Sequence, residues 1–294
     1  MREAVIVKGV GGLYTVRKDG KPYVCRARGI FRKEALTPII GDYVEISEID
    51  EEKMEAVIDE VFERRNKLVR PSVANVDQLA IVIAPIFPKP DFLLIDRLII
   101  TALYKGITPI LVINKSDQDR LACDEIRKEY KHALQSIVIT CAITGEGIEE
   151  LKSLLEDKIT VMCGQSGVGK STILNSILET QVMETGDISD KTKRGKHTTR
   201  HSEMFSLKEM DGYVIDSPGF SMYELGEIAP IELQKYYPEL DGKTFCKFQD
   251  CSHTKELGCM VDELIENGLF PEGRYDRYKY IYEELKEKEL NKYK

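Results

Sequence analysis

One segment of this 294-residue chain constrains its fold most, because it requires a strand, a tight loop and a helix in direct succession. The apolar run 159–162 predicts a buried strand, and the spacing of residues 172–178 predicts a helix. Between them, every position fits the pattern G-x-x-x-x-G-K-[ST]: Gly164, Gln165, Ser166, Gly167, Val168, Gly169, Lys170 and Ser171. A strand before and a helix after are the context that a phosphate-binding loop needs, so we predict a nucleotide-binding α/β domain.

The residue types of this loop suit phosphate for physical reasons. Glycine lets backbone N–H groups turn toward phosphate oxygens where a Cβ atom would block the approach. The positive end of the following helix, which begins near Thr172, faces the same anion. We expect Lys170 to neutralise the β- and γ-phosphates and the Ser171 hydroxyl to coordinate Mg²⁺.

A second motif identifies the base. It follows the apolar run 109–113 and fits the pattern N-K-x-D with Asn114, Lys115, Ser116 and Asp117. The carboxylate of Asp117 can accept hydrogen bonds from N1–H and the 2-amino group of guanine, whereas adenine lacks this pair of donors and would leave a buried carboxylate unpaired. Cys141 and Ala142 follow the next predicted strand and suit a backbone contact with guanine O6. The predicted nucleotide is therefore GTP.

Two further segments suit the γ-phosphate and its metal ion. Asp216 follows a predicted strand and begins a D-x-x-G motif that ends at Gly219. We expect Asp216 to hold Mg²⁺ through a water molecule and the Gly219 N–H to sense the γ-phosphate. The basic segment 191–200 lies where a GTPase places its first switch, and Thr199, or else Thr198, is the expected Mg²⁺ ligand there.

The residue directly after D-x-x-G bears on hydrolysis. Many GTPases orient the attacking water with a glutamine at this position, but here it is Phe220, which cannot hydrogen-bond a water. We therefore predict slow intrinsic turnover and a water-positioning group from elsewhere. His197 is the candidate, since imidazole can orient a water or accept its proton near neutral pH. A contact with RNA, or packing on the loop, explains this histidine equally well.

The order of these signals is unusual: guanine motif, phosphate loop, first switch, second switch. A parallel sheet tolerates such a relocation when the original chain ends can be joined by a short connection. From about residue 66 the predicted strands alternate with helices, including helices at 91–105 and 124–134, which is typical of a mostly parallel sheet covered on both faces. We predict a circularly permuted P-loop GTPase domain over residues 66–228.

Residues 1–65 predict an all-β domain, because short alternating runs are separated by glycine and aspartate turn signals. Five or so such strands make a small barrel, and the OB-fold is the commonest barrel of that size. The region carries a basic run made of Arg17, Lys18, Lys21, Arg26, Arg28, Arg32 and Lys33. This run is either a solvated face or a surface for RNA backbone, which OB-folds often bind.

The C-terminal residues 229–294 predict a mostly helical domain with a metal site. Its pattern is C-x₄-C-x-H-x₅-C, formed by Cys246, Cys251, His253 and Cys259. Three thiolates and one imidazole are the full tetrahedral set of a closed structural Zn²⁺ site. Because no coordination position stays open, we expect one structural zinc ion per chain, with a redox pair or buried thiols as the alternative.

Composition bears on partners and location. The formal net charge of −8 argues against a protein that coats nucleic acid non-specifically. No apolar run approaches the roughly 20 residues that a membrane helix needs, and the first residues lack the apolar core of a secretory signal. We expect a cytoplasmic protein with no membrane partner.

The motif order, the run from Arg70 to Gln78 and the phosphate-loop string together resemble the RsgA (YjeQ/YloQ) family. Its members are bacterial circularly permuted GTPases that act in maturation of the small ribosomal subunit. The resemblance covers essentially the whole chain. It implies an N-terminal OB-fold that binds RNA, a permuted GTPase domain and a C-terminal zinc domain. It also implies the 30S subunit and its 16S rRNA as partners, with 30S-stimulated turnover of GTP to GDP.

Two other functions remain open from the residues. The first is an RNA-binding module that binds GTP but hardly hydrolyses it. The second is a P-loop ATPase or small-molecule kinase, which requires that the match from Asn114 to Asp117 be coincidental. Lys170, Ser171 and Asp216 favour the enzyme over the module. Nothing in the sequence demands more than a monomer.

Overall fold

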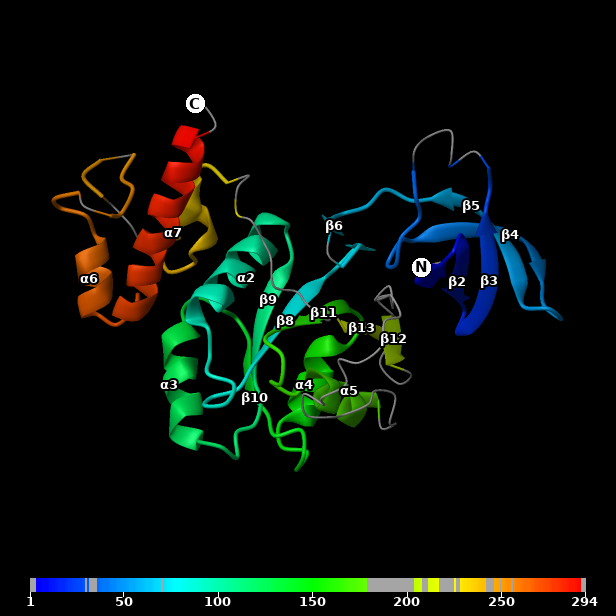
Figure 1. Cartoon of the computed structure of the whole chain (residues 1–294), viewed down its shortest axis with the longest axis horizontal. Coiled ribbons are helices and arrows are strands. Elements are labelled where there is room, and N and C mark those ends of the chain that lie inside the picture. Colours follow the sequence, from blue (N-terminus) through cyan, green and yellow to red (C-terminus); the bar gives the residue numbers. More distant parts are fainter. Residues whose placement is uncertain are drawn as a thin grey trace, which may run out of the picture.

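The computed structural model describes residues 4–29, 31, 36–69, 71–178, 204–207, 211–216, 225, 228–241, 246–248, 250–254 and 256–291. Within this part of the chain, an N-terminal barrel and a C-terminal helical region lie at opposite ends of a central α/β domain (Figure 1). This arrangement confirms the predicted succession of an all-β, an α/β and a helical part. The exact domain limits stay predictions.

The N-terminal barrel is a closed five-stranded sheet. Its strands are β1 (Val5–Val10), β2 (Leu13–Lys18), β3 (Lys21–Ala27), β4 (Val44–Asp50) and β5 (Glu55–Val61), in the order β1-β2-β3-β5-β4. Strands β3 and β5 are parallel, whereas the other neighbours are antiparallel. Backbone hydrogen bonds of 3.0 Å from Val44 to Ala4 and from Ile6 to Asp42 close β1 onto the start of β4. The resulting circular order is that of the predicted OB-fold.

The central sheet has six strands, and all but one pair run parallel. They are β8 (Gln78–Ile83), β9 (Thr108–Ile113), β10 (Ile137–Ile139), β11 (Ile159–Cys163), β12 (Met204–Leu207) and β13 (Gly212–Asp216), in the order β10-β9-β8-β11-β13-β12. Only β12 and β13 are antiparallel. A short ribbon of β6 (Lys67–Leu68) and β7 (Val73–Ala74) precedes β8.

Helices cover both faces of this sheet. Strand β8 shows why, because successive side chains point to opposite faces. Its residues Leu79 and Ile81 pack with α2 (Phe92–Tyr104) and α3 (Arg120–Tyr130). Its residues Ala80 and Val82 pack with α4 (Ile148–Leu155) and α5 (Lys170–Leu178). A strand buried on both sides must be apolar at every position, which explains the continuous apolar runs of the sequence.

The prediction for α3 was wrong at its boundaries. The helix begins four residues before the expected start and ends at Tyr130 instead of Leu134. The side chain of Asp119 accepts a hydrogen bond of 3.0 Å from the Ala122 N–H and so caps the helix at its true start.

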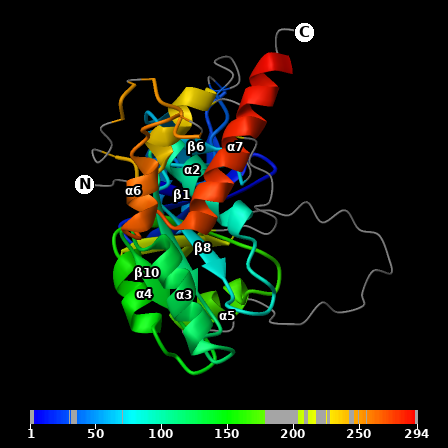
Figure 2. The ribbon, with the colours of Figure 1, turned by 90° about the vertical axis from the view of Figure 1, so that its left-hand side faces the viewer.

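The C-terminal region packs against α2 of the central domain. It contains the 3₁₀ helix η1 (Pro230–Tyr236), α6 (Val261–Glu266) and α7 (Glu272–Asn291). Its apolar core, with Leu233, Tyr237, Phe270 and Tyr278, includes Ile100 from α2. Figures 1 and 2 show α7 beside α2, at the end of the molecule away from the barrel.

A buried ionic network joins this region to the α/β domain. Arg274 of α7 is fully buried between the carboxylates of Asp96, from α2, and Glu239, which follows η1. Its guanidinium also lies over the rings of Tyr130 and Tyr237, with centroids at 5.2 and 4.8 Å. A buried arginine with two carboxylate partners fixes how the two parts fit together, because leaving any of these charges unpaired is costly.

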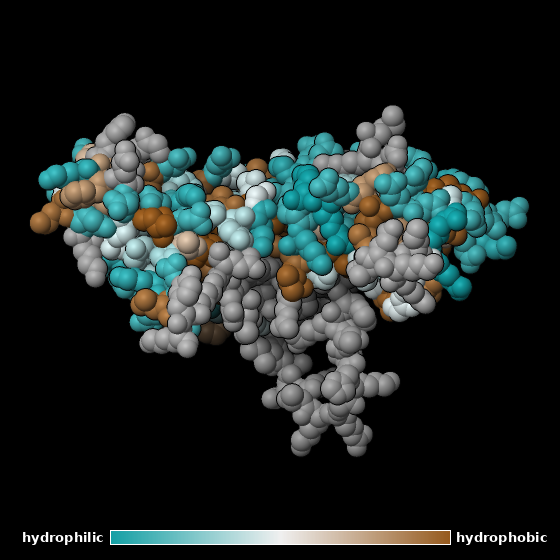
Figure 3. Space-filling model, turned by 90° about the horizontal axis from the view of Figure 1, so that it is seen from above, coloured by the Kyte–Doolittle hydropathy of each residue, from teal (hydrophilic) through white to brown (hydrophobic). Residues whose placement is uncertain are grey.

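On the face of the molecule seen from above, hydrophilic side chains cover much of the described surface, with small apolar patches between them (Figure 3). Among the described helices, none combines the length and apolar character required to cross a membrane.

Candidate functional site

The phosphate loop connects β11 to α5 and contains glycine where no other residue fits. Gly164 has φ +141°, and a Cβ atom there would lie 2.0 Å from the carbonyl oxygen of Val82 in β8. Gly169 has φ +94°, and its Cβ atom would lie 2.4 Å from Nδ2 of Asn114. Both positions combine a left-handed or strained backbone with a close approach, so the loop is tight for steric reasons.

Lys170 is the first residue of α5, and its side chain reaches back to the start of this loop. Its Nζ donates hydrogen bonds of 2.9 Å to the carbonyl oxygens of both Gly164 and Gln165. Burial lowers the pKa of Lys170, and the carboxylate of Asp216 opposes this effect. Asp216 ends β13 and pairs in register with Met162 of β11, so it lies at the edge of the sheet from which the loop leaves.

The first turn of α5 contains Ser171 and Thr172 and continues the loop directly. The Ile173 N–H donates to the Gly169 carbonyl at 2.9 Å, which starts the helix inside the motif. The N-terminus of α5 therefore begins within the loop, and a helix N-terminus in this place is a ready anion-binding site.

The guanine motif follows β9 and is joined to two neighbouring loops through Asn114. Nδ2 of Asn114 donates to the Val168 carbonyl of the phosphate loop at 2.9 Å. Its Oδ1 accepts from the Thr140 hydroxyl at 3.2 Å and from the Ala142 N–H at 3.1 Å. Asn114 is 2 % exposed, so these are buried interactions that hold the three predicted recognition segments together.

The remaining residues of the motif lie around this junction. Lys115 adopts a left-handed backbone with φ 63°, and its Nζ donates to the Phe87 carbonyl at 3.3 Å. The thiol of Cys141 contacts Oδ1 of Asp117 at 3.2 Å. Sequence reasoning assigned Cys141 only a backbone contact, and it missed this side-chain contact with the carboxylate expected to read guanine.

Several predicted site residues lie outside the part of the chain that the structure describes. These are Thr199 and its alternative Thr198, His197 and Gly219. Their roles stay predictions.

The predicted metal ligands meet in the C-terminal region. The ligand atoms of Cys246, Cys251, His253 and Cys259 all lie within 4.8 Å of one another. The Cys246 and Cys259 sulfurs are 3.8 Å apart. A tetrahedral zinc ion with Zn–S bonds of about 2.3 Å separates two sulfur ligands by about 3.8 Å. The donor set and its spacing therefore fit zinc.

The imidazole of His253 is oriented for such a role. Its Nδ1 lies 3.5 and 3.4 Å from the sulfurs of Cys246 and Cys259, while Nε2 lies 2.9 Å from Oε1 of Gln234. A hydrogen bond from Nε2 to this amide oxygen leaves the Nδ1 lone pair for the metal. Burial lowers the pKa of His253, which favours the neutral form that binds metal. All seven cysteines are free thiols in the structure, so the three of this cluster can serve as metal ligands.

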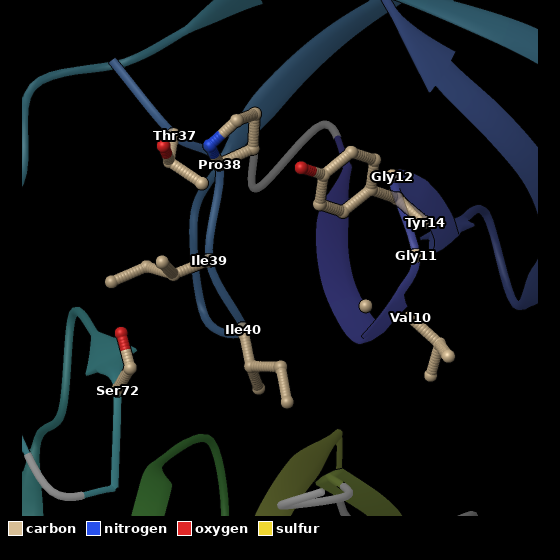
Figure 4. Close-up of a pocket in the computed structure, with 10 residues that line it drawn as sticks. Val10, Gly11, Gly12, Tyr14, Thr37, Pro38, Ile39, Ile40 and Ser72 are labelled. Atoms are coloured by element: carbon tan, nitrogen blue, oxygen red, sulfur yellow. The ribbon is translucent and has the colours of Figure 1, made fainter. Parts of the chain in front are cut away.

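A separate hollow of about 340 Å³ opens between the β1–β2 hairpin and the chain before β4 (Figure 4). Tyr14, Thr37 and Ser72 contribute hydroxyl groups to its wall. None of its lining residues carries a charge, so it lacks the groups that would neutralise phosphate.

A sheet of this order, with a phosphate loop after β11 and a guanine motif after β9, defines a P-loop GTPase whose guanine-recognition half precedes its phosphate-binding half. Comparison with known proteins agrees. The family model described as RsgA GTPase matches residues 61–226, and the RsgA N-terminal domain model matches residues 3–58.

Relatives match along the full chain. A "Small ribosomal subunit biogenesis GTPase RsgA" from Ruminiclostridium cellulolyticum is 45% identical and covers 98% of this chain and 95% of its own. A relative of the same name from Geobacillus sp. (strain WCH70) is 41% identical, and the match covers 98% of this chain and 99% of the relative. The crystal structure of YjeQ from Thermotoga maritima has a TM-score of 0.80 and 36% identity, covering 96% and 97%. That of YloQ, described as a circularly permuted GTPase, has a TM-score of 0.78 and 32% identity, covering 97% and 95%. The chain belongs to the RsgA family of GTPases.

Proposed function

We propose that this protein binds the small ribosomal subunit late in its maturation and hydrolyses GTP to GDP and phosphate when bound there. The observation that supports the nucleotide part is the hydrogen bond between Asn114 and the Val168 carbonyl, because it holds the guanine motif against the phosphate loop. The ribosomal part rests on membership of the family and on the function given in the names of relatives.

The site residues take distinct proposed roles. Asp117 accepts hydrogen bonds from guanine, with Asn114, Lys115 and Ser116 holding its loop. Cys141 and Ala142 offer backbone contacts to the base. The phosphates lie against the loop N–H groups and the first turn of α5, formed by Gly164, Gln165, Ser166, Gly167, Val168, Gly169, Lys170, Ser171 and Thr172. Lys170 exchanges its two loop carbonyls for β- and γ-phosphate oxygens.

The proposed metal for hydrolysis is Mg²⁺, which supplies charge neutralisation at the β- and γ-phosphates. Ser171 and Thr199 are the proposed ligands, and Asp216 acts through a water molecule. The Gly219 N–H senses the γ-phosphate, and His197 orients the attacking water. Because Phe220 cannot perform that last task, turnover is slow without the ribosomal particle.

We further propose that rRNA contacts the basic run of the barrel. Part of this run is already paired: Lys21 with Glu51, and Arg28 with Glu48 and Asp59. These pairs are solvent-exposed and therefore weak, so phosphate groups can replace the acidic partners. The 16S rRNA of the 30S subunit is the proposed ligand of this surface.

The zinc ion is proposed to be structural, with Cys246, Cys251, His253 and Cys259 closing its coordination shell. Proposed domain limits are residues 1–65, 66–228 and 229–294. One chain provides every proposed nucleotide and zinc group, which supports a monomer. Assembly of bacterial ribosomal subunits takes place in the cytoplasm, which is the proposed location.

The test is a multiple-turnover phosphate-release assay with purified 30S, 50S and 70S particles side by side. We expect 30S particles to raise turnover at least about tenfold, with the effect declining steeply as salt rises, because phosphate contacts release counterions. GTP binding without hydrolysis in every mixture would instead support the RNA-binding module. Stimulation that is independent of salt would contradict the rRNA contact.

A further inference from the structure

The loop that follows β10 is folded tightly, and this fold sets the backbone position of Glu146. The Cys141 N–H donates to the Glu146 carbonyl at 3.0 Å, which closes the loop on itself. Gly147, with φ 71°, lies so close to β10 that a Cβ atom would be 2.2 Å from the Ile139 carbonyl oxygen. The backbone at both ends of this loop is therefore held in one place.

From this position, the Glu146 carboxylate reaches the guanine loop. Its Oε2 accepts a hydrogen bond of 2.7 Å from the hydroxyl of Ser116, and its Oε1 accepts one of 2.6 Å from Nη1 of Arg120. Ser116 is the variable position of the N-K-x-D motif and is 5 % exposed. Arg120 is the first residue of α3. One carboxylate thus joins the recognition loop and the start of the next helix.

The ionised form of Glu146 suits these contacts. The hydrogen bond from Ser116, and next that from Arg120, lower the pKa of Glu146 although partial burial opposes them. The carboxylate therefore accepts both hydrogen bonds throughout the neutral pH range.

Asp117 directly follows Ser116, so the hydrogen bond between Glu146 and Ser116 acts on the residue proposed to recognise guanine. The Cys141 thiol contacts Asp117 from the same loop that carries Glu146. The backbone N–H of Ser116 also donates to the Thr140 carbonyl at 3.1 Å. These contacts restrict the guanine loop around Asp117. Among them, the contact from Glu146 is made by a charged carboxylate.

We infer that Glu146 is a positioning residue for guanine recognition: by holding Ser116 and Arg120, it orients the Asp117 carboxylate toward the N1–H and 2-amino groups of the base. This inference rests on the proposed GTP-binding function. Without Glu146 the loop samples more conformations, so the guanine contacts weaken while the phosphate loop, on the other side of Asn114, is unchanged.

The test compares Glu146→Ala with Glu149→Ala. Glu149 is an acid three residues further on, whose carboxylate pairs with Lys152 on α4 and not with the guanine loop. Equilibrium binding is measured for GTP, for ITP, which lacks the 2-amino group, and for inorganic tripolyphosphate, which has no base. Tripolyphosphate binding reports whether the phosphate loop and the fold remain intact.

For Glu146→Ala we expect GTP binding to weaken about tenfold, as loss of a charged hydrogen bond implies. The ratio of GTP to ITP affinity should shrink, tripolyphosphate affinity should change less than about twofold, and Glu149→Ala should match the wild type. In a Ser116→Ala background the effect of Glu146→Ala should become smaller, because the two side chains act through one contact.

Equal losses for GTP and tripolyphosphate would mean a merely structural role and would overturn the inference, as would unchanged GTP binding. A wild-type protein that binds ATP as tightly as GTP contradicts the proposed function itself, whatever Glu146 does. The two failures are therefore distinguishable.

Discussion

Nδ2 of Asn114 donates a hydrogen bond of 2.9 Å to the carbonyl oxygen of Val168, although the two residues are 54 positions apart. The contact explains how a permuted chain can make an ordinary nucleotide site. Strands β8, β9 and β11 are parallel, so their carboxyl ends lie at the same edge of the sheet. The loops at that edge come together in space, and their order along the sequence makes no difference.

Replacement of Asn114 should therefore affect both stability and nucleotide binding. Asn114→Ala removes the partner of the Val168 carbonyl and of the Ala142 N–H, and buried groups left unpaired cost about 1–3 kcal/mol each. We expect the free energy of unfolding in urea to fall by about 2–3 kcal/mol, and GTP binding to weaken as well. The exposed amide of Asn267, replaced in the same way, is the control. An unchanged free energy of unfolding for Asn114→Ala would show that Asn114 does not stabilise the contact between the guanine motif and the phosphate loop.

Lys170→Ala should remove catalysis while leaving the fold intact. The ammonium is proposed to neutralise phosphate charge, and deletion of such a group costs about 100-fold or more in turnover. Lys158 provides a matched control, because its Nζ also donates to a backbone carbonyl, that of Leu154, but at the far end of α4. GTP hydrolysis in the presence of 30S particles is the measurement. A Lys170→Ala variant with wild-type turnover would exclude the loop as the catalytic site.

Removal of zinc should destabilise the C-terminal region and leave the nucleotide site almost unchanged. The segment that carries the predicted zinc ligands Cys251 and His253 packs on α7, where the hydroxyl of Tyr278 donates to the Ser252 carbonyl at 2.7 Å. The chain contains no tryptophan, so tyrosine fluorescence can report the unfolding of this tyrosine-rich region. We expect one zinc ion per chain by elemental analysis, and a lower melting temperature after chelation or in Cys251→Ser. Metal-free protein of unaltered thermal stability would argue against the site.

The buried Arg274 should be more important for stability than any surface ion pair. Arg274→Met leaves Asp96 with Arg277, at 2.6 Å, but deprives the buried Glu239 of its guanidinium partner. We expect a loss of about 3–5 kcal/mol in the free energy of unfolding, as for other broken buried pairs. Lys279→Ala removes an exposed pair with Asp276 on the same helix and should cost less than about 1 kcal/mol. Similar urea midpoints for the two variants would contradict this view of the network.

The sequence predicted what depends on local patterns. The phosphate loop, the guanine motif and the Cys–His spacing are short strings whose residue types have a chemical reason, and the continuous apolar runs of β8 and β11 indicated buried parallel strands. The contacts of Arg274 with Asp96, and of Glu146 with Ser116, could not be predicted in this way. They join residues far apart in the chain, and no periodicity or spacing marks such partners. The pairing of Lys21 with Glu51 was missed for the same reason.

An exchange of the base that Asp117 is proposed to recognise tests whether the guanine motif and the phosphate loop form one GTP site. Xanthine has a carbonyl oxygen where guanine has its 2-amino group, so the amide of Asp117→Asn can donate where the carboxylate accepted. Hydrolysis of GTP, XTP and ATP is measured with 30S particles for both proteins. We expect the wild type to hydrolyse GTP and the variant to prefer XTP, with ATP a poor substrate for both. Equal hydrolysis of ATP and GTP by the wild type, or a variant with an unaltered nucleotide preference, would contradict a single GTP site.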